Sequence, residues 1–129
     1  MATENCTIIN KTKGKLPSLP FVSIKEAILG KQYDLSVGLL PSKEQKKINK
    51  IYRNKNKTTN ILSFPLTLIS GEITFDPVQV KHDAPQFEMS YAKFLKYLFI
   101  HGCLHLKGFK HSSTMEKEEK RFLKKFSRK

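Results

Sequence analysis

The sequence predicts one α+β domain in which helices pack against a small mixed sheet of four strands. Short runs rich in β-branched residues alternate with segments whose apolar residues recur at helical spacing. No repeat, low-complexity tract or long linker interrupts them. The chain has 129 residues, 39% of them hydrophobic, which is enough for one core. We therefore expect residues 1–129 to form a single domain.

The first half of the chain predicts two strands and two helices in alternation. These elements are a strand over 5–11, a helix from Phe21 to Gly30, a strand over 34–40 and a helix over 42–53. A capping-box pattern opens the second helix at Ser42. A helix between two strands is typical of a parallel pair, so we expect these two strands to be parallel.

The second half predicts two neighbouring strands followed by two helices. These elements are strands over 60–65 and 71–75, a helix over 90–106, and a helix to about residue 126 with a capping box at Ser113. The short connection between the strands predicts an antiparallel pair. Residues 76–88 show no periodicity and are expected to be irregular. The aromatic residues of the two helices are expected in the core rather than as platforms for stacked bases.

Three histidines near the end of the long helix have a spacing that predicts a metal site. On a helix, His101 and His105 lie on one face with Cβ atoms about 6 Å apart, so both can reach one ion. Gly108 can adopt the left-handed conformation that ends a helix and returns His111 as a third ligand. Three nitrogens leave one tetrahedral position open, which is typical of catalytic zinc. The alternative is two surface histidines and one in a loop, but the third histidine and the glycine favour a metal. We expect one zinc per chain, and the spacing leaves nickel or another divalent metal open.

Two residues beside these histidines limit the chemistry. Zinc proteases of the H-E-x-x-H type carry a glutamate after the first histidine as general base, and this chain has Gly102 there. A protease is therefore not expected. Cys103 lies about 200° around the helix from the ligand face, so we interpret it as a small buried apolar residue.

The charge of the chain favours a polyanionic partner. Twenty-four Lys and Arg against eleven Asp and Glu give a net charge of +13. Such a positive charge favours nucleic acid as the partner over an acidic protein or a membrane. The alternative is that the charge only keeps the protein soluble, and the charge alone does not distinguish RNA from DNA. The chain shows no signal segment, no apolar run of about 20 residues and no C-x-x-C pair. A cytoplasmic location is expected.

Four segments together resemble the YbeY-type bacterial endoribonucleases that mature ribosomal RNA. In chain order they are Asn49 with Tyr52-Arg53, Thr59 through Pro65, Gly71-Glu72-Ile73, and His101 through His111. The resemblance covers roughly residues 45–120. It implies a cytoplasmic, zinc-dependent endoribonuclease that prefers single strands. Such an enzyme acts in maturation of the 3′ end of 16S ribosomal RNA and in ribosome quality control. The implied partners are single-stranded RNA, ribosomal RNA and the small ribosomal subunit, without DNA or membrane.

The resemblance also implies roles for particular residues. By position, the three histidines are the metal ligands and Arg53 is the functional arginine near the site, where its planar fork can bind phosphate. The alternative for Arg53 is an ordinary surface residue at a helix end. Ser63 is either a hydroxyl donor in the cleft or structural, and Glu72 either an acceptor behind the ligands or an exposed strand residue. We interpret His82, in a polar loop, as a bystander.

The chain departs from the family pattern at three positions. Lys110 precedes the third histidine, where the family usually has aspartate; Glu72 replaces an aspartate, and Asn60 stands where aspartate is common. Lys110 and the missing glutamate favour an alternative function, a zinc-stabilised RNA-binding ribosome-assembly factor with little or no cleavage. No general base is evident, and either water or a ribose 2′-hydroxyl can be the nucleophile.

Overall fold

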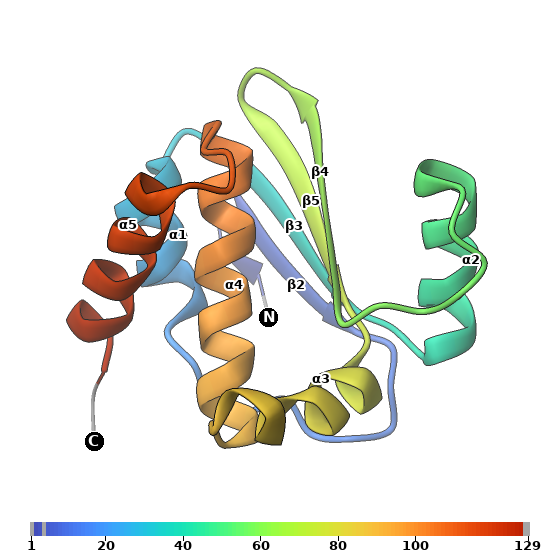
Figure 1. The fold of residues 1–129 in the computed structure, drawn as a ribbon. Helices are drawn as coiled ribbons and strands as arrows, with labels where there is room; N and C mark the ends of the chain where they lie inside the picture. The colour runs from blue at the N-terminus through green and yellow to red at the C-terminus, as the bar shows by residue number, and fades with distance from the viewer. Residues whose placement is uncertain (1, 4, 128–129) are drawn as a thin grey trace.

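Helices cover one face of a mixed sheet, and a single helix stands against the other. The computed structural model describes residues 2–3 and 5–127, and Figure 1 shows α1, α4 and α5 on one side of the sheet and α2 on the other. The strands are β1 (Ala2–Thr3), β2 (Cys6–Asn10), β3 (Asp34–Leu39), β4 (Ile61–Thr67) and β5 (Ser70–Phe75). The helices are α1 (Phe21–Leu29), α2 (Ser42–Arg53), α3 (Pro77–Asp83), α4 (Tyr91–Lys107), α5 (Ser113–Lys125) and the 3₁₀ helix η1 (Ala84–Phe87).

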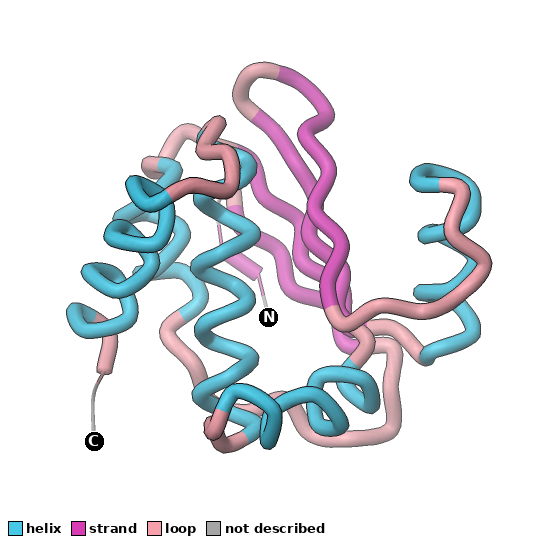
Figure 2. Tube along the Cα trace, viewed as in Figure 1, coloured by secondary structure: helices cyan, strands magenta, loops and turns pink. Residues whose placement is uncertain are grey.

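The strands, magenta in Figure 2, form one sheet. Their order in it is β1-β2-β3-β5-β4. The pairs β2–β3 and β3–β5 are parallel, whereas β4 and β5 form an antiparallel hairpin, so both pairing predictions are confirmed. The α+β class and the four expected strands are confirmed as well. The two-residue strand β1, which is too short to leave a periodic signal, adds a fifth strand antiparallel to β2. At the opposite edge, β4 pairs with β5 alone among the described strands.

The prediction that residues 76–88 are irregular is wrong, because α3 and η1 occupy most of this stretch. The buried Asp76 side chain accepts hydrogen bonds from the backbone N–H groups of Val78 and Gln79, at 3.1 and 3.2 Å. Pro77 follows at the first helical position, where its missing N–H costs nothing. The Asp-Pro pair is therefore a helix start, but a helix of only 7 residues is too short for a visible period.

Both predicted capping boxes are also wrong, although the helices exist. In α2 the cap is Pro41, whose carbonyl accepts the N–H groups of Glu44 and Gln45, both at 3.0 Å. In α5 the cap is Ser112, one residue before the predicted Ser113, and its hydroxyl accepts the N–H of Met115 at 3.2 Å. Of these two residues, Ser112 caps its helix through its side chain, whereas Pro41 takes the cap position without a side-chain acceptor. The predicted serine is therefore shifted into the first turn of its helix.

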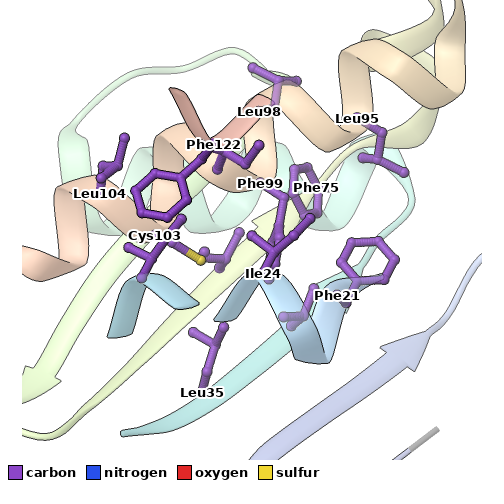
Figure 3. Close-up of a cluster of buried hydrophobic side chains, with 14 of the residues drawn as sticks. Phe21, Ile24, Leu35, Phe75, Leu95, Leu98, Phe99, Cys103, Leu104 and Phe122 are labelled. Atoms are coloured by element: carbon purple, nitrogen blue, oxygen red, sulfur yellow. The ribbon is translucent and has the colours of Figure 1, made fainter. Parts of the chain in front are cut away.

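The core lies between the sheet and the helices α1 and α4 (Figure 3). Phe21 of α1 meets Phe99 of α4 edge to face, with ring centroids 4.9 Å apart. Phe94 and Phe99 are fully buried, as expected for the aromatic residues of α4. Cys103 is buried in the same cluster, and its burial raises the pKa of the thiol well above its usual range. The interpretation of Cys103 as a small apolar core residue is confirmed. No helix among the described residues is long and apolar enough to span a membrane.

Candidate metal centre and its cleft

The end of α4 brings three imidazole rings together. His101 and His105 lie one turn apart, and the helix ends at Gly108, whose φ of 114° is left-handed. The N–H of Phe109 then bonds back to the carbonyl of Leu104 at 3.0 Å, and the returning chain places His111 against the other two rings. One ring nitrogen from each histidine lies within 4.8 Å of those of the others, so the group can hold a metal ion.

Hydrogen bonds behind two of the rings leave their ligand nitrogens free. Nδ1 of His105 donates to the carbonyl of Phe109 at 3.2 Å, and Nδ1 of His101 donates to the carboxylate of Glu119. In the neutral form of each ring, Nε2 then carries the lone pair, and the two Nε2 atoms face each other at 3.1 Å. Two ligands of a tetrahedral zinc, each about 2.0–2.1 Å from the ion, stand at nearly this separation. The donor set therefore fits a divalent cation.

The electrostatic setting of His105 also suits a metal ligand. Burial lowers the pKa of this imidazole, and the neighbouring His101 and His111 lower it further. A lowered pKa keeps the ring neutral near pH 7. A neutral ring offers the lone pair that a metal needs.

Glu119 is a functional residue that the sequence interpretation missed. It lies on α5 with 6% of its surface exposed, one oxygen on His101 and the other accepting the hydroxyl of Tyr97 at 3.4 Å. Carboxylates in this position fix the tautomer and direction of a ligand histidine. A signal existed, because Glu119 lies between Met115 and Phe122 on the apolar face of α5. A carboxylate on the apolar face of a helix is buried, and a buried carboxylate needs a charged or hydrogen-bonding partner.

Replacing Glu119 with glutamine should weaken zinc binding about 10- to 100-fold while leaving the fold intact. The amide keeps the shape but cannot hold the imidazole as strongly as a carboxylate. Competition with a chromophoric chelator measures the zinc dissociation constant. Glu118→Gln is the matched control, since among the residues that the structure describes Glu118 forms its ion pair with Arg121 of the same helix, away from the histidines. Equal zinc affinities in the two variants would show that Glu119 does not support the site.

The histidines line a cleft of about 400 Å³ between α4 and β4. Ser63 and Pro65 line its β4 side, and Arg53 at the end of α2 reaches its mouth. The Ser63 hydroxyl donates to the carbonyl of Gly102 at 3.3 Å, which ties β4 to α4. The full lining is Arg53, Ile61, Ser63, Pro65, His101, Gly102, His105, Leu106 and His111. The structure thus places Arg53 and the three histidines in one cavity, and no carboxylate is among these residues.

Two buried amide side chains help to hold α2, and hence Arg53, in place. Gln45 donates to the carbonyls of Thr74 and Thr59 at 3.1 and 3.3 Å. One turn later, Asn49 donates to the carbonyl of Lys57 at 2.8 Å. These bonds fasten the helix to β5 and to the loop before β4. The arginine at the end of α2 is therefore positioned beside the cleft.

Gly102 faces the sheet, which explains the absence of the protease glutamate. A Cβ atom at this position would come within 3.0 and 3.1 Å of the side chains of Ile73 and Ile61. A glutamate there would run into β4 and β5 instead of reaching the metal. The close contact of α4 with the sheet therefore requires a very small residue.

Three other polar residues considered above lie outside the cleft. Gly71 and Ile73 face α4, so Glu72 between them points to the opposite face, where it lines a groove with Thr74. Of the two alternatives for Glu72, this position disfavours the acceptor behind the ligands and favours a strand residue of the opposite face, where the side chain is half-buried. His82 is exposed on α3 beside Asp83, outside the histidine cluster. Lys110 is exposed, although it directly precedes the third histidine.

A basic segment borders the cleft. Between residues 45 and 60 the chain has six cations and no acidic residue. They are Lys46, Lys47, Lys50, Arg53, Lys55 and Lys57, and all six are exposed. None takes part in an ion pair within the part of the chain that the structure describes. Their charge is therefore available to an anionic partner.

Comparison with known proteins decides the family. Residues 11–127 match the family model described as Endoribonuclease YbeY. The chain belongs to the YbeY family. The resemblance inferred from the four sequence motifs is confirmed, and the matched region contains the entire cleft.

Individual relatives agree with this assignment. The Endoribonuclease YbeY of Mycoplasmopsis synoviae is 36% identical over 74% of this chain and 68% of its own length. That of Neorickettsia sennetsu is 35% identical over 76% of each chain. That of Colwellia psychrerythraea is 34% identical over 65% of this chain. The match spans only 59% of the length of that relative. A solution structure from Thermotoga maritima has a TM-score of 0.68 and 28% identity, covering 94% of this chain and 88% of its own.

Proposed function

We propose that this protein is a zinc-dependent endoribonuclease that prefers single strands. We further propose that it acts in the cytoplasm, in maturation of the 3′ end of 16S ribosomal RNA on the small ribosomal subunit and in ribosome quality control. The observation that carries the enzymatic proposal is the convergence of three imidazole nitrogens in the cleft that Arg53 borders. The names of the relatives supply the reaction class.

The proposed roles follow from the chemistry of phosphodiester cleavage. His101, His105 and His111 would hold the zinc, which supplies a Lewis acid for a phosphate oxygen and lowers the pKa of a bound water. Glu119 keeps the His101 ring in the direction that the ion requires. Arg53 would bind a phosphate oxygen through its fork, with a charge that persists at any working pH. We assign no general base, because no carboxylate lines the cleft.

Cleavage of a labelled RNA tests this proposal. Protein loaded with one equivalent of zinc should cut an unstructured strand faster than the same sequence in a duplex, and excess chelator should stop the reaction. The ends of the products identify the nucleophile. Attack by a 2′-hydroxyl leaves a 2′,3′-cyclic phosphate, whereas attack by water does not. Cleavage that continues after complete removal of the metal would contradict the zinc requirement.

The second candidate is an RNA-binding assembly factor in which zinc only fastens the end of α4 to the following loop. Lys110 beside a ligand and the lack of a carboxylate in the cleft favour it. Under this alternative, zinc raises the melting temperature and RNA still binds. However, the labelled strand stays intact at every zinc concentration.

RNA binding should weaken steeply as salt rises. Each phosphate neutralised on a single strand contributes about 0.7 to the slope of log affinity against log salt. If most of the six cations of the basic segment contact phosphate, the slope should be about −3 to −4. Fluorescence anisotropy at several salt concentrations measures it. An affinity that stays flat between low and moderate salt would remove this segment from the proposed RNA interface.

A further inference from the structure

Two aromatic rings meet on the face of β4 that looks away from the metal centre. Tyr52 belongs to the last turn of α2 and Phe64 to β4, and their ring centroids lie 5.0 Å apart at an angle of 50°. Phe64 is half-buried, whereas Tyr52 is 68% exposed. Phe64 therefore contacts the Tyr52 ring in a tilted arrangement, while Tyr52 itself remains largely exposed to solvent.

The aromatic pair lies one strand away from the cleft. Ser63 and Pro65 line the cleft, and Phe64 between them points to the other face because side chains alternate along a strand. Since β4 is the last strand of the sheet, its outer edge joins the two faces. Figure 1 shows α4 on one side of β4 and α2 on the other. A polymer chain that leaves the cleft beside Arg53 and crosses the outer edge of β4 would reach Tyr52.

The charge around Tyr52 favours a nucleic acid as its partner. Tyr52 is preceded in the chain by Lys50 and followed by Arg53 and Lys55. All three cations are exposed, and none forms an ion pair with the residues that the structure describes. A surface that combines cations with an accessible aromatic ring matches single-stranded nucleic acid. The cations neutralise phosphates while the ring stacks on a base of any sequence.

We infer that Tyr52, backed by Phe64, stacks on a base of the RNA whose phosphate Arg53 holds, and thereby selects single strands. This inference rests on the proposed function. A base within a duplex is already stacked on both of its faces, so neither face is open to the Tyr52 ring. An unpaired base has a face available for stacking. Tyr52 is thus a specificity-determining residue outside the metal cleft.

Binding of matched probes to the zinc-loaded protein tests the inference. The probe is a 2′-O-methyl strand of about 12 nucleotides without self-complementarity, a length within the usual site size. The comparisons are an abasic strand of the same length and the corresponding duplex, and gel analysis checks that each probe stays intact. Tyr52→Ala should bind the base-bearing strand roughly 5- to 100-fold more weakly. It should bind the abasic strand and the duplex as the parent does.

Two control variants separate stacking from charge. Tyr52→Phe keeps the ring and should bind every probe like the parent. Lys50→Ala keeps the ring but loses a charge, so it should weaken the base-bearing and abasic strands alike and lower the salt slope by about 0.7. Tyr52→Ala should leave that slope unchanged. Thermal melting confirms that each variant is folded.

Three results would overturn the inference. If Tyr52→Ala binds the base-bearing strand as well as the parent, the ring does not stack on RNA, and a protein partner becomes the better explanation of its exposure. If the variant loses the same affinity for abasic and base-bearing strands, the ring does not act through a base. In both cases the proposed function survives if the parent still cleaves RNA. A parent that neither binds nor cleaves RNA would remove the proposed function and this inference together.

Discussion

Replacing His105 with alanine should remove most of the bound zinc and abolish RNA cleavage. The three rings form a triangle in which the His105 centroid lies 4.6 Å from that of His101 and 4.7 Å from that of His111. Loss of a direct ligand should cost more than the roughly 10- to 100-fold in affinity that loss of a supporting hydrogen bond costs. Elemental analysis after gel filtration measures the zinc content, and cleavage of the single-stranded RNA measures the activity.

His82→Ala is the matched control for this prediction. His82 is exposed on α3 and lies outside the histidine cluster, so its removal should change neither zinc content nor activity. The His101 and His111 variants should behave like the His105 variant. Full zinc occupancy in all three would show that the ion binds elsewhere.

Replacing Arg53 with alanine should lower the rate of RNA cleavage roughly 10²- to 10³-fold while zinc content stays near that of the parent. This loss of rate is the one expected when an enzyme loses a single preorganised hydrogen-bond donor to the charge that develops in the transition state. Because Arg53 is exposed at the end of α2, its removal should change stability by no more than about 0.5 kcal/mol. Single-turnover cleavage, zinc analysis and thermal melting of one preparation separate these effects.

Two further variants show whether the Arg53 effect depends on geometry. Arg53→Lys keeps the charge but loses the fork, so it should recover only part of the activity. Lys47→Ala removes another exposed charge of the same helix, at a residue that does not line the cleft, and should mainly weaken RNA binding. If Arg53→Ala unfolds, or cleaves RNA as fast as the parent, the arginine is structural or idle. The enzyme proposal would then depend on the metal alone.

The sequence predicted most of the fold because the long elements carry a periodic signal. It also predicted the position of the histidines, since their spacing and Gly108 are local features of one helix end. It failed at α3, which is too short for a period, and at the capping serines, because the cap positions belong to the preceding residues Pro41 and Ser112. These failures concern single turns, where one hydrogen bond decides the outcome.

The parts of the site that sequence did not reveal come from contacts between distant segments. Glu119 reaches His101 only because α5 packs on α4, and Tyr52 meets Phe64 only because α2 lies against the outer face of β4. The two alternatives for Glu72 could not be separated from the sequence for a related reason. The sequence shows that Glu72 and its neighbours on β5 point to opposite faces of the sheet. Which of the two faces packs against α4 is decided by tertiary packing.

Titration of zinc into metal-free protein, with cleavage followed at each step, tests the central claim most directly. The account predicts that the rate of cutting single-stranded RNA rises in proportion to bound zinc and reaches its plateau at one zinc per chain. The His105→Ala variant should bind little zinc over the same range and stay inactive. Full cleavage by metal-free protein, or zinc that binds fully while the RNA stays intact, would contradict a catalytic metal held by these three histidines.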